Sequence, residues 1–476
     1  MTRNYHHLTF PEVRFPETSK AGPFNSTCSN AQIVTSVQQV FPHSSALASS
    51  VASNPAPVTS SEPPSRTNDE AHGKPKGDGL GSVPWVATTY YGEGLPFSIV
   101  HQVSAEMFTA FGASLAAVGY TSLYGLAWNF KFLWSPTVDV VGQKRSWVVA
   151  TQIALALVMF ALAMPAQHGD LPTVAWGLIA VSILAATQDI AVDGFYLDAL
   201  SDKRQAAMSG LRVGAYRIAM LVGKGGLVVL AGLAGGWKAA FIAAGAMMLL
   251  LGIGHALFLP RPATVVRSET KKTWREFVAP FLSFLKQPKV GLILAFILTY
   301  RAGDSLMFNM GTPFFKDLGL STAQRGIING TWGTLAGVGG SILGGFLVSK
   351  WSLERTLRPI VHAQGVAILL YAWLAFTRPS LPAIVAVVLA EQLIAGIGTA
   401  GLMVFLMRRC QGAHKASHFA IGSALMSLGA TLAGLVAGKL AQRYGFTVFF
   451  LISFAAAVPG MILSWFVPTA RADEQA

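Results

Sequence analysis

The sequence predicts an all-α membrane protein with about twelve transmembrane helices in two six-helix bundles. Of its 476 residues, 52% are hydrophobic and 12% are charged, whereas a soluble protein carries about twice that share of charge. From Pro84 onward about twelve apolar segments of roughly 20 residues follow one another, each long enough for a hydrocarbon core about 30 Å thick. One longer, basic connection separates the first six segments from the last six.

The domain boundaries follow from these segments and from the polar stretches between them. We expect a leader at 1–82, a first bundle at 83–259, a cytoplasmic linker at 260–289, a second bundle at 290–468 and a cytoplasmic tail at 469–476. The expected spans lie near residues 84–108, 113–135, 147–166, 172–197, 207–234, 237–259, 290–314, 325–348, 358–377, 381–407, 416–441 and 445–467.

The leader differs in composition from the rest of the chain. It is rich in Ser, Pro, Thr, Asn and Gly, and it has no stretch able to span a bilayer, so we expect it to be disordered. It is either a flexible leader or upstream sequence translated from a wrongly chosen start. Because it lacks the pattern of a cleavable signal, the first span is expected to direct insertion.

The net charge of +13 is interpreted as an orientation signal. The leader is electrically balanced, so the excess of positive charge belongs to the membrane region, where it lies in short loops without a basic stripe for nucleic acid. Basic residues cluster after even-numbered spans, for example at Lys144, Lys350 and Arg408. Since Lys and Arg near helix ends stay in the cytoplasm, both termini are expected there.

Two carboxylates in the fourth span are the first candidates for a functional site. Asp189 and Asp193 are four residues apart and so share one helix face, with Gln188 beside them. Ionisable groups at membrane depth are costly and usually face a partner or a cavity. Counting back from the turn between spans four and five makes a pair between Asp189 and Arg217 feasible. Arg212 lies about 140° around the helix from Arg217, so we prefer Arg217.

The second half repeats this theme. Arg301 and Asp304 are three residues apart in the seventh span, and Glu391 with Gln392 lies inside the tenth. The alternative is that Arg301 and Asp304 form an ion pair that only fixes helix packing. Glu93 lies in the first span between Gly92 and Gly94 and close to Pro96, where glycine and proline allow a helix break that frees backbone groups.

Two carboxylates that compete for one arginine can exchange a proton when their partners rearrange. This is the chemistry of proton symport, and Asp189 and Asp193 are therefore the proton-coupling candidates. Lys131 is a weaker gating candidate, since snorkelling to the interface explains it equally well. His101 and His418 are expected to be packed rather than to relay protons.

These residues belong to motifs that resemble the AmpG-type muropeptide permeases of the major facilitator superfamily, which are related to acetyl-CoA transporters. The resemblance runs from about Pro84 to Pro468. The motifs are Gly94-Leu95-Pro96, Lys131-Phe132-Leu133-Trp134-Ser135-Pro136, Thr187-Gln188-Asp189-Ile190, Tyr216-Arg217, Tyr300-Arg301-Ala302-Gly303-Asp304, Pro313-Phe314, Gly398-Thr399-Ala400 and Phe419-Ala420.

The resemblance implies a major facilitator fold and proton-driven import of anhydromuramyl peptides across a bacterial inner membrane for cell-wall recycling. It also implies an inner gate formed by Asp139, Lys144 and Arg145, although Ser135 stands where the family usually has glycine and Val140 where a basic residue is common. The corresponding loop of the second half has Ser349 in place of an acidic residue, so the gate is expected to be asymmetric.

The leading hypothesis is a proton symporter of an anionic small molecule. We expect Arg217 and Arg301 to hold substrate carboxylates, and Asp304, Glu93, Gln188, Glu391 and Gln392 to contribute to the substrate site. The alternatives are another anionic cargo such as an acyl-CoA or a peptide, or a membrane sensor that transports nothing. The chain has no nucleotide loop, metalloprotease helix or serine elbow, so we expect neither ATP-driven transport nor hydrolysis by this chain. We also expect no cofactor or metal ion, and a monomer.

Overall fold

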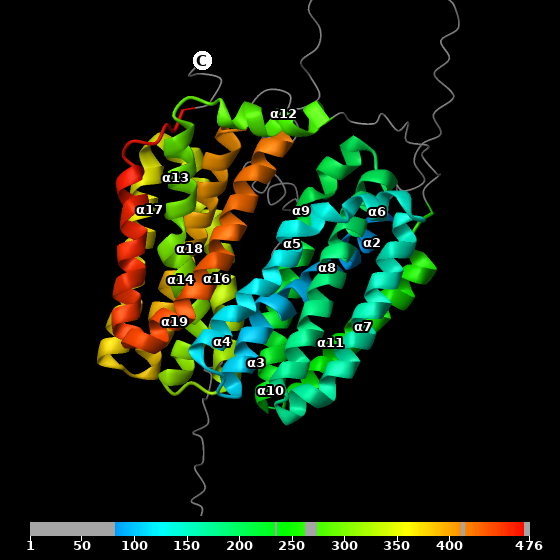
Figure 1. The fold of residues 1–476 in the computed structure, drawn as a ribbon, viewed down its shortest axis with the longest axis horizontal. Helices are drawn as coiled ribbons and strands as arrows, with labels where there is room; N and C mark the ends of the chain where they lie inside the picture. Colours follow the sequence, from blue (N-terminus) through cyan, green and yellow to red (C-terminus); the bar gives the residue numbers. More distant parts are fainter. Residues whose placement is uncertain (1–80, 234–235, 262–273, 411–414, 471–476) are drawn as a thin grey trace, which may run out of the picture. The chain divides into compact units, whose positions relative to one another are not determined.

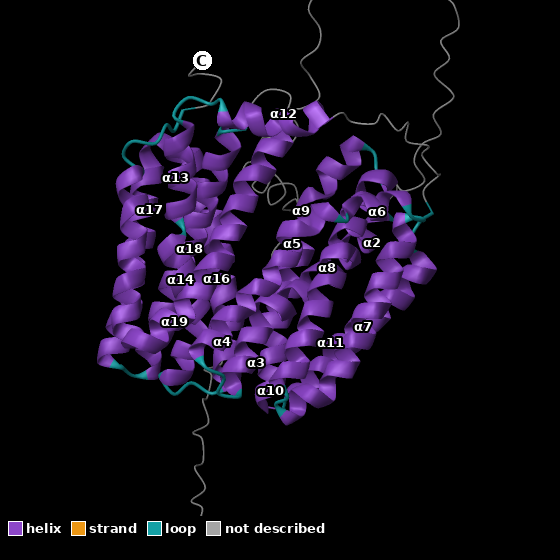
Figure 2. Cartoon of the chain, in the orientation of Figure 1, coloured by secondary structure: helices purple, strands orange, loops and turns teal. Residues whose placement is uncertain are grey.

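The structure is a computed structural model that describes residues 81–233, 236–261, 274–410 and 415–470. Nearly all of the expected leader, the middle of the expected linker and the tail lie outside these ranges. Every regular element within them is a helix (Figure 2), as the composition predicted.

The first bundle consists of the helices from Ser82 to Phe258. Its elements are α2 (Ser82–Ser98), η1 (Ile99–Val103), α3 (Ser104–Ala110), α4 (Leu115–Tyr120), η2 (Thr121–Gly125), α5 (Leu126–Phe130), η3 (Lys131–Leu133), α6 (Ser135–Val140), α7 (Lys144–His168), α8 (Leu171–Ala199), α9 (Asp202–Leu221), η4 (Val222–Leu227), α10 (Val228–Leu233) and α11 (Trp237–Phe258). Here η1 and η4 are π-helical, whereas η2 and η3 are 3₁₀ turns.

The second bundle follows a short helix that packs at one end of it. The elements are α12 (Trp274–Leu285), α13 (Val290–Tyr300), α14 (Ala302–Asp317), α15 (Thr322–Arg325), the π-helical η5 (Gly326–Trp332), α16 (Gly333–Trp351), α17 (Leu353–Thr377), α18 (Leu381–Arg408) and α19 (Lys415–Leu463). Figure 1 shows α12 across the end of the bundle that holds α13, α17 and α19. His418 of α19 bonds Ser283 of α12 at 2.8 Å and packs against the Phe284 ring, so it is a packed residue, as expected.

The membrane character of the fold is confirmed. In the described part of the chain, nine helices are long and apolar enough to cross a bilayer. The last of these nine helices, α19, contains two spans. They are separated by a bend at Gly445, where φ has the left-handed value of 74°. Large apolar side chains point outward, with Trp176 74% exposed and Phe376 80% exposed, as expected of a surface that faces lipid.

The second span is less regular than the sequence predicted. The expected continuous helix at 113–135 is a succession of α4, η2, α5 and η3. Here the chain packs closely on α19: a Cβ on Gly119 would lie 2.5 Å from the carbonyl oxygen of Gly434, and Ser122 donates to the carbonyl of Thr431. The tight contact with a distant helix explains why spacing alone did not reveal the 3₁₀ turns.

The first span is more regular than expected at Gly92–Pro96. Helix α2 continues through these residues to Ser98, and the irregularity follows them as the π-helical segment η1. Gly94 serves close packing, since a Cβ there would lie 2.7 Å from the carbonyl oxygen of Tyr216 in α9. The expected helix break at this motif is therefore wrong, and the glycine instead brings α2 against α9.

Small residues bring other helices together too. On α16, a Cβ on Gly340 would lie 2.0 Å from the Leu393 carbonyl, and one on Gly344 would lie 2.8 Å from Ile397 of α18. In the first bundle α7 packs against both α8 and α11 (Figure 1), and a Cβ on Gly245 of α11 would lie 3.2 Å from the carbonyl oxygen of Ala156 in α7. Within each bundle the helix backbones therefore approach one another closely, as small residues permit in membranes.

The helices of both bundles run between two ends, which we name by the helix ends and turns found at each. The start of α7 at Lys144, the turn from α8 to α9, helix α12 and the turn from α16 to α17 form what we call the basic end. The turns from α3 to α4, from α10 to α11 and from α14 to α15 form the opposite end.

Candidate functional site

The two aspartates of α8 each have their own cation. Asp189 forms an ion pair with Lys131 of η3. Asp193, one helical turn further on, accepts a hydrogen bond from the Tyr90 hydroxyl at 2.8 Å and pairs with Arg212 at 3.0 Å. The spacing of four residues thus places both carboxylates on one face of α8, between α2, η3 and α9.

A third carboxylate, Glu93 of α2, completes what we call the carboxylate cluster, made of Glu93, Asp189 and Asp193 with the cations Lys131 and Arg212. Glu93 is 9% exposed and close enough to both aspartates to interact with them electrostatically. Its Oε2 atom has no hydrogen-bond partner among the described residues. Three carboxylates against two paired cations leave one negative charge to be compensated, which a bound proton would do.

The cation from α9 is Arg212, whereas the sequence analysis preferred Arg217. The guanidinium of Arg212 lies 4.6 Å from the centre of the Tyr90 ring and 5.3 Å from that of Tyr196. Arg217 is exposed, and among the described residues no carboxylate lies within ion-pair distance of it. The angle between Arg212 and Arg217 around the helix indicated that only one of them can face this site. The packing of α9 against α2 decides which one does.

Gln188 is buried behind the carboxylate cluster. Neither of its side-chain polar atoms has a hydrogen-bond partner among the described residues. Its neighbour Gln152 belongs to a chain of polar contacts, in which the His255 imidazole bonds Gln152 at 2.7 Å and Thr88 at 2.9 Å. A buried amide without partners is costly, so Gln188 stands out among the polar side chains near the carboxylate cluster.

The pair of the second half forms as its spacing indicated. Arg301 lies at the break between α13 and α14, with φ −104° and ψ 6°. It donates to Asp304 at 2.6 Å and to the hydroxyl of Thr399 at 3.2 Å. Both terminal nitrogens of its guanidinium group are therefore engaged with protein atoms in this conformation.

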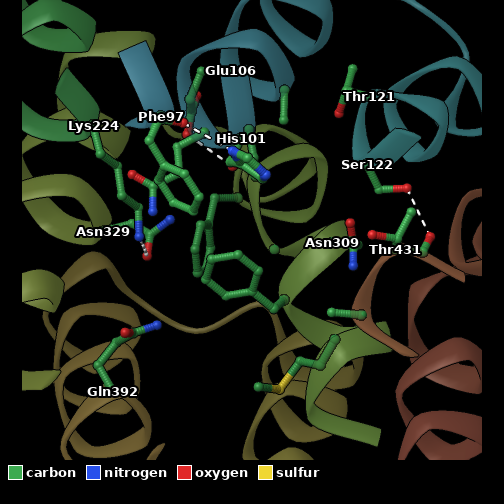
Figure 3. A pocket seen from close by; sticks show the side chains of 18 of the residues that line it. Phe97, His101, Glu106, Thr121, Ser122, Lys224, Asn309, Asn329, Gln392 and Thr431 are labelled. Atoms are coloured by element: carbon green, nitrogen blue, oxygen red, sulfur yellow. Dashed lines mark hydrogen bonds between the residues drawn. The ribbon is translucent and has the colours of Figure 1, made fainter. Parts of the chain in front are cut away.

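A cavity of about 300 Å³ lies between the two halves (Figure 3). Its walls come from α2, η1, α3, η2, α5 and η4 of the first half, and from α14, η5, α17, α18 and α19 of the second. Figure 3 shows Lys224 and Asn329 on one side of it, and Asn309, Ser122 and Thr431 on the other.

Several expected substrate residues line this cavity, and others do not. Glu391 and Gln392 line it, together with Asn309 and His101. The imidazole of His101 also stacks on the Phe97 ring at 4.0 Å. The substrate residues expected from the sequence that do not line this cavity are Arg217, Arg301, Asp304, Glu93 and Gln188.

The sequence analysis missed Lys224, Asn329 and Glu106, which all line the cavity. A signal for Lys224 was present, since it is a lysine between Gly223 and Gly225 in the middle of an apolar span. Asn329 and Glu106 gave weaker signals, because single polar residues in helices of this kind have many structural explanations.

A buried ion pair joins the two halves at the opposite end. Arg325 of α15 donates to Glu106 of α3 at 2.8 Å, and Thr312 of α14 donates to the same carboxylate at 2.9 Å. Nearby, the Lys316 ammonium donates to the backbone carbonyl of Thr109 at 2.6 Å. We call Glu106 and Arg325 the opposite-end lock, because their ion pair holds the halves together there.

The expected gate residues lie at the basic end. Lys144 pairs with Asp198 at 2.9 Å, and the Nε of Arg145 donates to the carbonyl of Leu259 at 3.2 Å. Both contacts are within the first half. The side chain of Asp139 lies outside the described residues, while Lys131 belongs to the carboxylate cluster.

No group of three or more His, Cys, Asp and Glu side chains that could hold a metal ion occurs in the described ranges.

Two membrane bundles around a shared polar cavity define the class of secondary transporters with the major facilitator fold. The model of the Major Facilitator Superfamily matches residues 86–418. Among solved structures, a D-xylose-proton symporter superposes with a TM-score of 0.64 at 12% identity, covering 83% of this chain and 99% of that chain. This likeness concerns the fold.

Curated relatives narrow the class. The anhydromuropeptide permease of Escherichia coli K12 is 32% identical over 379 residues, covering 78% of this chain and 77% of the relative. The putative transporter AmpG 4 of Rickettsia conorii is 25% identical, covering 79% of this chain and 94% of the relative. The chain therefore belongs to the AmpG-type permease family of the major facilitator superfamily, which confirms the resemblance seen in its motifs, and it is a multi-pass membrane transporter.

Proposed function

We propose that the protein imports anhydromuramyl peptides across the bacterial inner membrane and that protons drive the import. The family membership supports the cargo, because the Escherichia coli relative is a permease for anhydromuropeptides. The loop charges support an orientation with the basic end and both termini in the cytoplasm.

The carboxylate cluster carries the proton part of the proposal. Asp189 and Asp193 exchange protons as their contacts with Lys131 and Arg212 form and break, because a carboxylate that loses its cation at membrane depth gains by taking up a proton. Glu93 holds the remaining proton while both aspartates are paired. Movement of α2 or α9 against α8 would change these pairings and so couple protonation to conformation.

The opposite-end lock supports a conformation closed at the outer side. Outward opening must separate Glu106 from Arg325, and inward opening leaves this pair intact. Lys144 and Arg145, with Asp139, then act as the gate at the cytoplasmic side. Arg217 and Arg301 remain candidates for contact with cargo carboxylates, and Arg301 would have to exchange Asp304 for the cargo.

Uptake into proteoliposomes tests the function. A radiolabelled anhydromuramyl tripeptide is expected to accumulate when the pH gradient is inward and acid outside, and to equilibrate without accumulation when an ionophore removes the gradient. A purified protein that is correctly inserted and moves no muropeptide would contradict the cargo. Accumulation that does not depend on the pH gradient would contradict proton coupling.

A further inference from the structure

Lys224 presents a buried ammonium in the wall of the cavity. Its residue is 8% exposed, and its Nζ donates one long hydrogen bond of 3.3 Å to Oδ1 of Asn329 and lies 5.5 Å from the centre of the Phe308 ring. Among the described residues, no carboxylate lies within ion-pair distance of it. A buried charge without a counter-ion is costly, so this site favours an incoming anion.

The nearby carboxylates are already engaged. Glu106 accepts from Arg325 and Thr312. Glu391 accepts from the Tyr371 hydroxyl at 3.3 Å and from Gln392 at 3.1 Å. Both carboxylates are close enough to act electrostatically on Lys224, but neither lies within ion-pair distance of its ammonium, so the direct counter-ion position at Lys224 is not taken by either of them.

Backbone geometry directs polar side chains into the cavity. In the described ranges there are three π-helical segments, η1, η4 and η5, and each contributes cavity residues, such as His101, Lys224 and Asn329. A π-helical turn inserts a residue and rotates the side chains that follow, and such turns are frequent at functional sites. Segments η4 and η5 also touch, since a Cβ on Gly330 would lie 2.3 Å from the carbonyl oxygen of Lys224.

We propose that Lys224, supported by Asn329, binds a carboxylate of the cargo in the cavity between the halves. The inference rests on the proposed function and names the anchor of its substrate site. Oδ1 of Asn329 accepts the hydrogen bond from Lys224. The amide nitrogen of Asn329 is therefore able to donate to the same cargo carboxylate. Ser122, Asn309 and Thr431 on the other side present neutral hydroxyl and amide groups (Figure 3), which suit sugar hydroxyls and amides.

Lys224 has an advantage over Arg301 as this anchor. Arg301 is paired with Asp304 at 2.6 Å and does not line the cavity, so cargo would have to displace an internal carboxylate. Lys224 offers its charge without such an exchange. The cavity volume of about 300 Å³ lies at the lower end of ligand sites, so in this conformation it would hold one part of a peptide–sugar cargo.

Paired cargos test the assignment. Proteoliposome uptake is measured for an anhydromuramyl tripeptide with free carboxylates and for the same compound with its carboxylates converted to amides. The wild-type protein is expected to prefer the free acid by at least about tenfold in half-saturating concentration, because the free acid gains a charge-assisted contact that the amide lacks. In Lys224→Gln this preference should fall to within about twofold, and in Lys224→Arg it should persist.

Matched variants separate this role from a structural one. Lys350→Gln, at the exposed end of α16, should keep the preference for the free acid. Asn329→Asp supplies an internal carboxylate beside Lys224 without creating a void, so it should weaken uptake of the acid about tenfold and leave uptake of the amide nearly unchanged. This variant also decides the question if Lys224→Gln fails to reach the membrane.

A full preference for the acid in active Lys224→Gln or Asn329→Asp would overturn the assignment, as would loss of the preference in Arg301→Gln alone. Such results would leave the proposed function intact, because the wild-type protein would still import the free acid. A wild-type protein that takes up neither compound would instead contradict the proposed function.

Discussion

Asp189 and Asp193 lie one turn apart on α8 and pair with different cations, Lys131 and Arg212. The two cations come from different elements, η3 and α9. In the proposed mechanism, the proton occupancy of each aspartate depends on whether its own cation is in place.

Asparagine at either position tests this coupling. Asp189→Asn or Asp193→Asn keeps the side-chain size but removes the exchangeable proton, so accumulation driven by a pH gradient should fall at least about tenfold at normal membrane levels. Cargo exchange without a gradient should persist at a reduced rate. Gradient-driven uptake at the wild-type rate in both variants would remove these residues from the mechanism.

Asp170→Asn is a control on the same helix. Asp170 caps α8 outside the membrane, where its side chain accepts from the backbone N–H of Thr173 at 3.2 Å. The hydrogen bonds from Thr173 lower the pKa of Asp170. Because this pKa is lowered, the carboxylate of Asp170 contributes to stability at neutral pH. The contribution is lost only as the pH falls through the lowered pKa. Asparagine also caps helices, so uptake between pH 5 and 8 should not change.

Glu93→Gln tests the charge balance of the carboxylate cluster. The substitution removes the third carboxylate and leaves each aspartate with one cation. Because no proton is then needed to balance the cluster, cargo exchange across symmetric membranes should vary less with pH, by at most about twofold between pH 5.5 and 7.5. Counterflow measured at both pH values checks this, and a wild-type pH profile in the variant would place the proton elsewhere.

At the scale of elements, the opposite-end lock joins α3 to α15. Glu106→Gln leaves the Arg325 guanidinium buried without its counter-ion, and breaking a buried pair in this way costs about 3–5 kcal/mol. The closed arrangement at this end should lose stability relative to the open one. A cysteine at Thr109, in a chain with Cys28 and Cys410 replaced by serine, should then be labelled by an impermeant maleimide at least about tenfold faster.

The double variant Glu106→Gln/Arg325→Gln separates the lost pair from the stranded charge. It should recover much of the thermal stability that Glu106→Gln loses, while Thr109→Cys remains more accessible than in the wild type. Equal labelling in all backgrounds would show that the pair does not control opening at this end.

Close contact between η4 and η5 gives a second test of helix movement. A Cβ on Gly330 would lie 2.3 Å from the Lys224 carbonyl and 2.8 Å from Cα of Gly225, and these are backbone atoms that cannot turn aside. Gly330→Ala should therefore reduce transport at least about tenfold. Gly339→Ala on the adjoining helix α16, where nothing lies within 4 Å, should transport at the wild-type rate and serves as the matched control.

At the scale of the whole molecule, residues 1–80 are predicted to be dispensable. Their composition lacks any apolar stretch able to pack on the bundles. A chain that begins near residue 81 should reach the membrane at the level of the full chain and transport at the same rate. Normal membrane levels with lost uptake would show that these residues act in transport.

How far the sequence leads is visible in particular residues. The spacing of Asp189 and Asp193 predicted their common face, and that of Arg301 and Asp304 predicted their contact, because helical geometry fixes such pairs. The spacing did not indicate whether Arg212 or Arg217 pairs with the aspartates, since that choice depends on how α9 packs against α2. Lys224 and Asn329 lie 105 residues apart in the chain, so no local pattern could reveal that they meet.

The sequence by itself determined the membrane class, the approximate spans and the family, because apolar length, loop charge and ordered motifs are properties of local segments. Only the tertiary structure decided the second span's 3₁₀ turns, the π-helical segments around the cavity, the opposite-end lock and the partner of each buried charge. These features arise where backbones from distant segments meet, and a buried ion takes whichever counter-ion that packing brings within reach, because leaving it unpaired in a membrane is costly.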